Sequence, residues 1–156
     1  MIFCDISKEP FNGLASLRVG RFMCYPDMTE RTGKNYDVLF ERVADILRDT
    51  DYLVGNLETS VAGEELGGYT CEWYKFNTPT EYLASLKKCG FHLLSMATNH
   101  CLDRGEEGLL RTLDNVRGYG FETVGTYKTL EERDTPFVKE LGGIRIAFVN
   151  YTCTPF

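Results

Sequence analysis

The sequence lacks several features that would place it in a common class of protein. It has only two histidines among 156 residues, and its six cysteines form no C-x-x-C pair. The cysteine spacing therefore suggests neither a zinc ribbon nor a thioredoxin-type redox motif. No stretch approaches the roughly 18 apolar residues of a membrane span, and no basic segment followed by an apolar run indicates an export signal.

Positive charge is also scarce. The chain carries 17 Lys and Arg residues against 23 Asp and Glu residues, which gives a net charge of −6. Its longest basic cluster is Lys87-Lys88. No nucleic-acid partner is expected, because neutralising a phosphate backbone requires a concentration of Lys and Arg.

The cysteines and the missing export signal together favour the cytoplasm for the chain as written. Cys89, Cys101 and Cys153 lie beside predicted core segments and are interpreted as small hydrophobic residues in a reducing compartment. The competing interpretation is an exported protein with three disulfides, and the cysteine count alone leaves it open.

The length and composition predict one folded domain. Apolar residues make up 43% of the chain and aromatic residues 13%, which is enough for a packed core. Residues 1–14 show no sustained period and are interpreted as an irregular leader, followed by a domain over 15–156.

The apolar pattern alternates between the periods of strands and helices. It predicts strands at 15–19, 52–55, 91–97 and 121–124, and a hairpin of 137–141 with 144–150. It predicts helices at 36–47, from 78–81 to Gly90, and from 103 or 104 to about 118–120, with one helical turn at 130–133. Gly142-Gly143 is the hairpin signal. The order predicts an α/β fold with a largely parallel sheet and helical crossovers.

Several polar residues are candidates for helix caps. Asn35 or Asp37 can cap the helix over 36–47. Thr78 can cap the next helix, with Glu81 where a capping box requires it. Asp103 is interpreted as an N-cap in preference to a ligand, on residue type and position alone.

Polar residues also follow three of the predicted strands. These are Gly20-Arg21, the segment Asn56 to Glu58, and Asn99-His100 with Asp103 nearby. In open α/β sheets, ligands bind beyond the carboxyl ends of the strands, so these segments predict a metal or phosphate site.

Oxygen donors with an imidazole suit Mn, Fe or Zn. Two such ions, roughly 3.5–4 Å apart, would activate water and stabilise the leaving oxygen of a phosphoester, with His100 as the candidate general acid. Each residue also has a structural interpretation: Glu58 and Asn99 can be turn formers, and His92 can be a structural residue.

In combination, these segments resemble a known family. The matching motifs are Gly55-Asn56-Leu57-Glu58-Thr59, Phe76-Asn77-Thr78-Pro79, Gly90-Phe91, Thr98-Asn99-His100, Asp103 to Leu110, Gly125-Thr126-Tyr127 and Gly143 to Thr152. Over roughly residues 17 to 152 the chain resembles the CapA family of capsule synthesis, or poly-gamma-glutamate biosynthesis, proteins, which have a calcineurin-like metallophosphoesterase fold.

The resemblance implies roles for individual residues. Asn99 would be a metal ligand, and His100 would be the catalytic or phosphate-contacting imidazole. Asn56 and Glu58 would stand near the metals, with Glu58 the stronger candidate ligand. The implied cofactor is a divalent metal (Mn, Fe or Zn), and the implied partners are capsule-polymer synthesis components or a polyanionic or phosphorylated substrate. Family members are often membrane-anchored or exported.

The sequence departs from the family pattern in ways that weaken the metal site. A Gly-Asp pair that supplies a metal ligand is here Gly20-Arg21, and a Met-Cys-His stretch is here Met23-Cys24-Tyr25. The family's later histidines are absent from this sequence, which ends at Phe156. Since a guanidinium cannot coordinate metal, the site is expected to be degenerate.

Arg21 could instead bridge to Glu58 or hold an anion, with Asp103 as a second candidate for anion or substrate binding. A hydrolase-like fold with a degenerate metal site is the preferred hypothesis. The alternatives are a non-catalytic binding or scaffolding subunit and an α/β domain with no site. The resemblance is to the N-terminal half of the family's domain only. Half of a sheet would leave apolar faces and an edge uncovered, so self-association or marginal stability is expected.

Overall fold

The computed structural model describes residues 14–19, 32–69 and 75–153. Its elements are β1 (Leu14–Val19), the 3-10 helix η2 (Tyr36–Leu39), α2 (Ala44–Arg48), β2 (Tyr52–Leu57), α3 (Glu81–Lys88), β3 (Phe91–Ser95), α4 (Gly105–Gly118), β4 (Glu122–Val124), α5 (Leu130–Asp134), β5 (Phe137–Leu141) and β6 (Ile144–Phe148).

Strands β1 to β4 form one sheet in the order β1-β2-β3-β4, and each neighbouring pair is parallel. Strands β5 and β6 form a separate antiparallel pair. Parallel neighbours require crossovers, and α3 and α4 supply the ones after β2 and β3. The predicted α/β fold, its parallel sheet and its hairpin are therefore confirmed.

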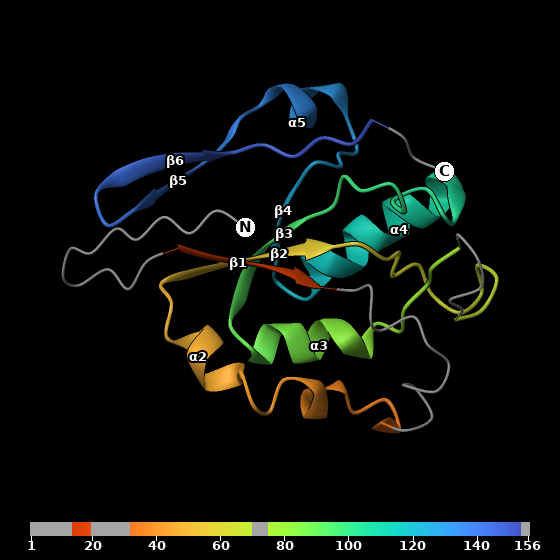
Figure 1. Cartoon of the computed structure of the whole chain (residues 1–156). Coiled ribbons are helices and arrows are strands. Elements are labelled where there is room, and N and C mark those ends of the chain that lie inside the picture. The colour runs from red at the N-terminus through yellow and green to blue at the C-terminus, as the bar shows by residue number, and fades with distance from the viewer. Residues whose placement is uncertain (1–13, 20–31, 70–74, 154–156) are drawn as a thin grey trace.

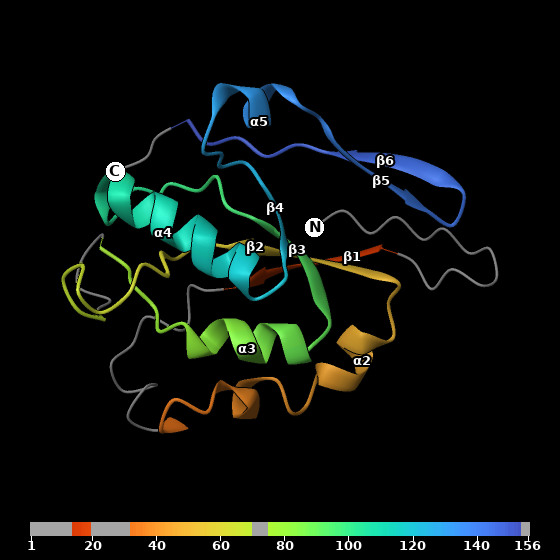
Figure 2. The same cartoon turned by 180° about the vertical axis from the view of Figure 1, so that it is seen from behind.

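The parallel sheet is covered on both faces (Figures 1 and 2). On one face, Leu53 and Leu94 of the sheet join Leu83 of α3 and Leu113 of α4 in the main apolar core. On the other face, a smaller cluster of sheet residues packs against three partly buried side chains of the hairpin, which are Phe137, Leu141 and Phe148. Both faces are apolar, as a parallel sheet requires.

His92 occupies an irregularity in the sheet. The β2–β3 register shifts between Leu53 and Val54, and His92 Nδ1 accepts a hydrogen bond of 3.0 Å from the backbone N–H of Leu53. The imidazole also stacks on Tyr52, with ring centroids 5.1 Å apart. Its interactions are those of a structural residue that pairs a backbone donor in the sheet.

Tyr52 connects this sheet to the hairpin. Its ring lies 5.6 Å from that of Phe148, and its hydroxyl donates to Glu122 of β4. The Lys139 ammonium of β5 forms an ion pair with the same Glu122. Burial and this carboxylate raise the pKa of Tyr52, so its phenol stays protonated and donates at any ordinary pH.

The predicted single helix over 36–47 is wrong. The chain forms η2, a turn, and then the five-residue α2. Asp37 accepts hydrogen bonds from Ser85 Oγ (2.5 Å) and Lys88 Nζ (2.6 Å) of α3, and these contacts favour the tight first turn. The break leaves the apolar side chain of Ile46 73% exposed.

The predicted cap of Asn35 on this segment is confirmed, since its Oδ1 accepts from the N–H of Asp37 at 3.3 Å. The predicted cap of Thr78 on α3 is wrong. The N-cap position of α3 is Thr80, which makes no side-chain cap bond, whereas the buried Thr78 hydroxyl lies 2.9 Å from Thr59 Oγ1. A tertiary contact to the loop after β2 has taken the hydroxyl that local pattern assigned to the helix.

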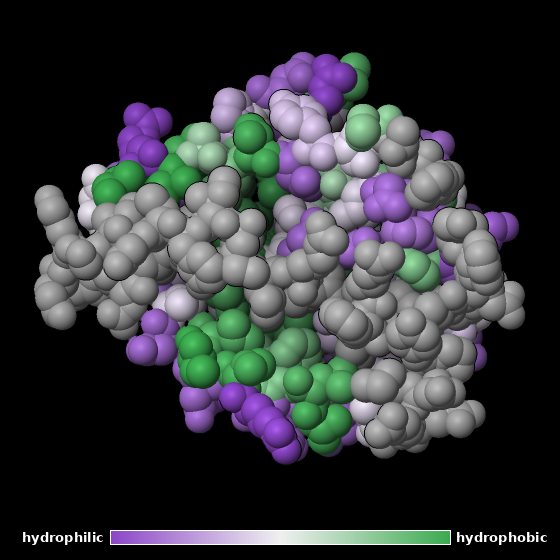
Figure 3. All heavy atoms as spheres, in the orientation of Figure 1, coloured by the Kyte–Doolittle hydropathy of each residue, from purple (hydrophilic) through white to green (hydrophobic). Residues whose placement is uncertain are grey.

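Several large apolar side chains are exposed on the surface. Figure 3 shows green apolar surface low on the visible face, over the η2–α2 segment, where Val38, Val43 and Ile46 are exposed. Val138 and Ile144 are exposed on the hairpin. Across the described residues, the helices are too short or too polar to span a membrane.

The interactions of His92 predict a pH dependence of stability. Burial lowers the pKa of His92 below its usual 6.5, with smaller effects in the same direction from Lys87 and Lys139 and an opposing effect from Glu122. The unfolded chain therefore takes up a proton at higher pH than the folded one, so the free energy of unfolding should fall as pH drops below about 6.5.

The variant His92→Asn keeps an acceptor for Leu53 N–H but does not titrate. Thermal unfolding of both proteins between pH 7.5 and 5 should show a smaller loss of stability for the variant, while His92→Ala should lose about 1–3 kcal/mol at every pH because the buried donor is left unpaired. Parallel pH profiles for the natural protein and His92→Asn would contradict this assignment.

Candidate functional site

Three loops meet at the carboxyl edge of the parallel sheet. They follow β2 at 58–62, β3 at 96–104 and β4 at 125–129, and all three strands run in the same direction. The predicted site residues of the first two loops lie in or beside them. They are Asn56, Glu58, Asn99 and His100. Because β2 and β3 are direct neighbours, these loops leave the sheet side by side.

The centre of this edge is a buried pair of titratable side chains. His100 Nδ1 lies 2.9 Å from Asp103 Oδ2, and the two side chains are 9% and 0% exposed. An ionised carboxylate can only accept hydrogen bonds. Nδ1 of His100 therefore carries a hydrogen and donates a hydrogen bond to Asp103 Oδ2. This bond fixes the orientation of the ring.

Phe76 holds this pair from a distant part of the chain. Its backbone N–H donates to the same Asp103 Oδ2 at 2.6 Å, and its ring lies 4.1 Å from the His100 imidazole. The backbone N–H of His100 donates to Thr98 Oγ1 at 3.2 Å. The carboxylate and the aromatic ring therefore fix the imidazole, and the Thr98 hydroxyl fixes the backbone of the same residue.

Burial raises the pKa of Asp103 above its usual 3.8, and the hydrogen bonds from Phe76 and His100 act in the opposite direction. Asp103 Oδ1 is buried, and no residue in the described part of the chain bonds to it. The N-cap residue of α4 is Arg104, so the interpretation of Asp103 as a helix cap is wrong. Its carboxylate faces the imidazole.

The structure gives fewer contacts for the other predicted site residues. Glu58 is buried at 7% exposure directly after β2, and Asn99 is half-buried beside His100. Asn56 pairs with Ser95 in the sheet, and its Oδ1 accepts from the Ser95 hydroxyl at 3.2 Å. Arg21 lies outside the described residues.

Two asparagines that sequence reasoning did not assign hold the loops of this edge. Asn77 Oδ1 accepts from Ala62 N–H at 2.9 Å, and its Nδ2 donates to Gly63 O and Gly68 O. Asn150 accepts from Ala97 N–H at 2.6 Å and donates to Ala97 O at 3.2 Å. The signal for Asn77 was its place in the Phe76-to-Pro79 motif, whereas nothing local indicated Asn150.

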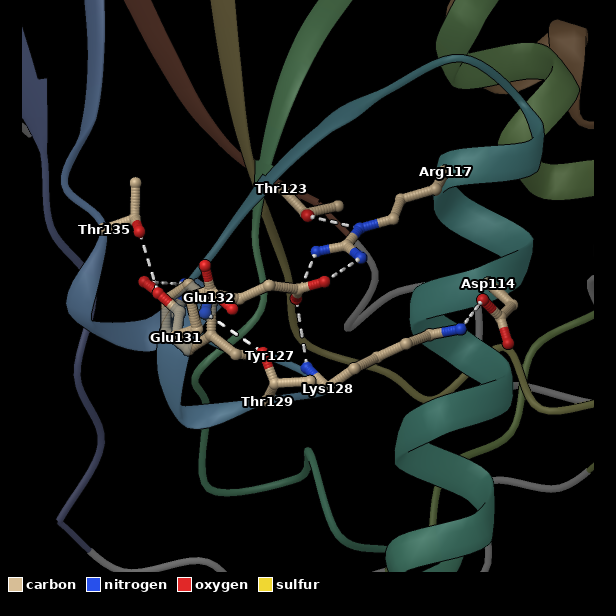
Figure 4. Close-up of polar contacts among 10 residues, drawn as sticks. Asp114, Arg117, Thr123, Tyr127, Lys128, Thr129, Glu131, Glu132 and Thr135 are labelled. Atoms are coloured by element: carbon tan, nitrogen blue, oxygen red, sulfur yellow. Dashed lines mark hydrogen bonds and ion pairs between the residues drawn. The ribbon is translucent and has the colours of Figure 1, made fainter.

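A second polar cluster lies at the C-terminal end of α4 (Figure 4). Arg117 donates from Nε to Thr123 Oγ1 at 3.2 Å and from both terminal nitrogens to Glu132 at 3.2 and 3.0 Å. Glu132 also accepts from Lys128 N–H at 3.1 Å, and the Lys128 ammonium pairs with Asp114. These groups satisfy one another, so the cluster fastens α5 to α4 and β4.

The described residues do not supply a two-metal centre. Within 14–19, 32–69 and 75–153, no group of three or more His, Cys, Asp or Glu side chains is arranged to hold a metal ion. Glu58 is the one carboxylate of the predicted metal ligands, and the other two, Asn56 and Asn99, are amides. The nearby carboxylate of Asp103 is bonded to His100. The donor chemistry among these residues does not fit two divalent cations.

The fold and this edge define an α/β domain with a buried histidine–carboxylate pair at the carboxyl ends of its strands. The sequence model described as "Bacterial capsule synthesis protein PGA_cap" matches residues 17–155. The chain therefore belongs to the PGA_cap family of bacterial capsule synthesis proteins.

Two curated relatives are similar to the chain. One is "PGA biosynthesis protein CapA" of Bacillus subtilis (strain 168), 27% identical over 149 residues, which are 95% of this chain and 38% of the relative. The other is "Capsule biosynthesis protein CapA" of Bacillus anthracis, 25% identical over 128 residues, which are 81% of this chain and 31% of the relative. The chain thus spans less than two fifths of the length of these relatives.

The His100–Asp103 geometry predicts different outcomes for two substitutions of Asp103. In Asp103→Asn the carboxamide oxygen can still accept from both His100 Nδ1–H and Phe76 N–H. In Asp103→Leu both donors lose their acceptor, so the free energy of unfolding should fall by about 2 kcal/mol more than in Asp103→Asn.

The imidazole can be followed directly by ¹H–¹⁵N correlation spectroscopy of the ring. A slowly exchanging Nδ1–H signal of His100 is expected in the natural protein and in Asp103→Asn, and it should be lost in Asp103→Leu. A rapidly exchanging Nδ1–H of His100 in the natural protein would show that the bond to Asp103 does not orient the ring.

Proposed function

We propose that this chain acts in capsule-polymer synthesis, through a metallophosphoesterase-like edge whose metal centre is degenerate. Membership of the capsule synthesis family supports the biological setting, and the names of the two Bacillus relatives point to a poly-gamma-glutamate capsule. The single observation that carries the chemical part is the buried His100–Asp103 pair, which lies where the strands deliver Glu58 and Asn99.

The bond to Asp103 suits a histidine whose imidazole contacts a phosphoryl or carboxylate oxygen of a ligand. With Nδ1 engaged by Asp103, Nε2 is the ring nitrogen proposed to contact that oxygen or to exchange a proton with it. The Phe76 ring against the imidazole restricts its motion and excludes water from one side. His100 is accordingly the proposed catalytic or anion-contacting residue, and Asp103 is proposed to position it.

The proposed metal donors are Glu58, Asn99 and Asn56. A divalent ion bound there would supply Lewis-acid activation of a phosphoester and of water. One carboxylate with two amides is a weak set for such an ion, because affinity rises with the number of charged ligands. Arg21, where the family pattern has an aspartate ligand, adds a cation in place of an anion.

The alternative function is a non-catalytic subunit that binds a phosphorylated or polyanionic partner at the same edge. Arg21 favours it, because a guanidinium binds phosphate or carboxylate in a bidentate manner. The two functions share the His100–Asp103 pair and differ in whether a divalent ion or an anion is bound beside it.

Residue 21 provides a test of the degenerate metal centre. Calorimetric titration of the purified protein with Mn²⁺ should give weak binding, and Arg21→Asp should tighten it by about tenfold or more because a charged ligand is restored. Arg21→Gln is the matched control, since it removes the cation without adding a ligand, and it should gain much less. Equal Mn²⁺ affinity for all three proteins would contradict the assignment of residue 21 to the site.

Hydrolysis separates the two functions. If the edge is degenerate, the natural protein should not hydrolyse a generic phosphodiester in the presence of Mn²⁺. Mn²⁺-dependent hydrolysis that His100→Ala abolishes would show an intact catalyst and overturn the proposal of degeneracy.

Anion binding is tested with inorganic phosphate. The natural protein should bind phosphate, and Arg21→Gln should weaken this binding by about five- to tenfold, because a charge-assisted bidentate contact is removed. Phosphate binding that is insensitive to Arg21→Gln would count against the subunit interpretation.

A further inference from the structure

A small pocket lies between the three loops of the carboxyl edge, on the side of α4. Its apolar wall includes Leu57 at the end of β2, Met96 after β3 and Leu109 of α4. Its polar wall includes Ser60 from the loop after β2 and Thr126 from the loop after β4. The space is sufficient for about one water molecule.

The two hydroxyls on this wall are buried without a hydrogen-bond partner. Ser60 is 2% exposed and Thr126 is 7% exposed, and neither Ser60 Oγ nor Thr126 Oγ1 has a partner among the described residues. The neighbouring hydroxyl of Thr112 differs, because it accepts from Val61 N–H at 3.0 Å and donates to Gly108 O at 2.7 Å. Both of these hydroxyls therefore belong to residues that line the same pocket.

Burying a hydroxyl without a partner is costly, and proteins satisfy such groups with ordered water when the space is polar and large enough. We propose that this pocket is a water site, in which one buried water molecule bridges the Ser60 and Thr126 hydroxyls. A water in this position would accept from one hydroxyl and donate to the other, and each hydroxyl would gain the partner that the protein does not supply.

The bridge has a structural consequence at the candidate site. Strands β2 and β4 do not pair with each other, since β3 lies between them. A water that joins Ser60 to Thr126 therefore connects two loops that the sheet ladder leaves unconnected. Since Ser60 follows Glu58 by two positions, the bridge would hold the loop that begins at Glu58 to the loop after β4.

A double-mutant cycle of Ser60→Ala and Thr126→Val tests the bridge. If the water is present, each single substitution should lower the folding equilibrium constant by about fivefold, because the water loses one of its partners. The double variant should lose little more than either single one, which gives a clear coupling between the two sites.

If no water is bound, each substitution removes an unsatisfied buried hydroxyl. The folding equilibrium constant should then rise with each change, and the two effects should be additive, which would overturn the proposal. Thr50→Val is the matched control, because its hydroxyl donates to Leu47 O at 2.8 Å away from the pocket, so its effect should add to that of Ser60→Ala.

A direct measurement accompanies the cycle. In the natural protein, water–protein Overhauser spectra should show a long-lived water next to the Thr126 methyl group, and the signal should disappear in the double variant. A natural protein that lacks this signal would overturn the proposal even if the cycle shows coupling.

Discussion

The parallel direction of β1 to β4 is the constraint on which the rest of the chain depends. Every crossover must return the chain to the same end of the sheet, so the carboxyl ends and the loops that follow them accumulate at one edge. Two residues about 40 positions apart, such as Glu58 and His100, are brought to the same edge by this rule without any local signal between them. The site exists because the strands share a direction.

Loops at that edge have no ladder to satisfy their backbone groups, and buried amides cannot be left unpaired. Asparagine side chains supply the hydrogen bonds. Asn77 bonds to the backbone of Ala62, Gly63 and Gly68, and Asn115 donates to Val61 O at 2.7 Å. Asn150 bonds to both the N–H and the carbonyl oxygen of Ala97. An amide suits this work because it both donates and accepts. The rigidity of the edge therefore comes from polar side chains behind the candidate site residues.

Sequence periodicity predicted most of the fold because each strand and helix buries one set of apolar residues at a regular spacing. It failed where a polar side chain had two possible partners. Asp37 can support a local helix, yet it bonds Ser85 and Lys88 of α3, and Thr78 can cap a helix, yet it contacts Thr59. Local pattern cannot weigh a tertiary partner, and so it could not place Asn150 against Ala97, 53 positions earlier.

The same limit applies to Asp103, and it bears on what the edge can bind. A carboxylate three residues after a histidine is typical of a helix cap or a ligand. Asp103 is instead buried and bonded to His100, so its charge faces the imidazole. With Arg21 in place of an aspartate, the balance of charge proposed for the edge shifts by two units toward the positive, which favours an anion over a second cation.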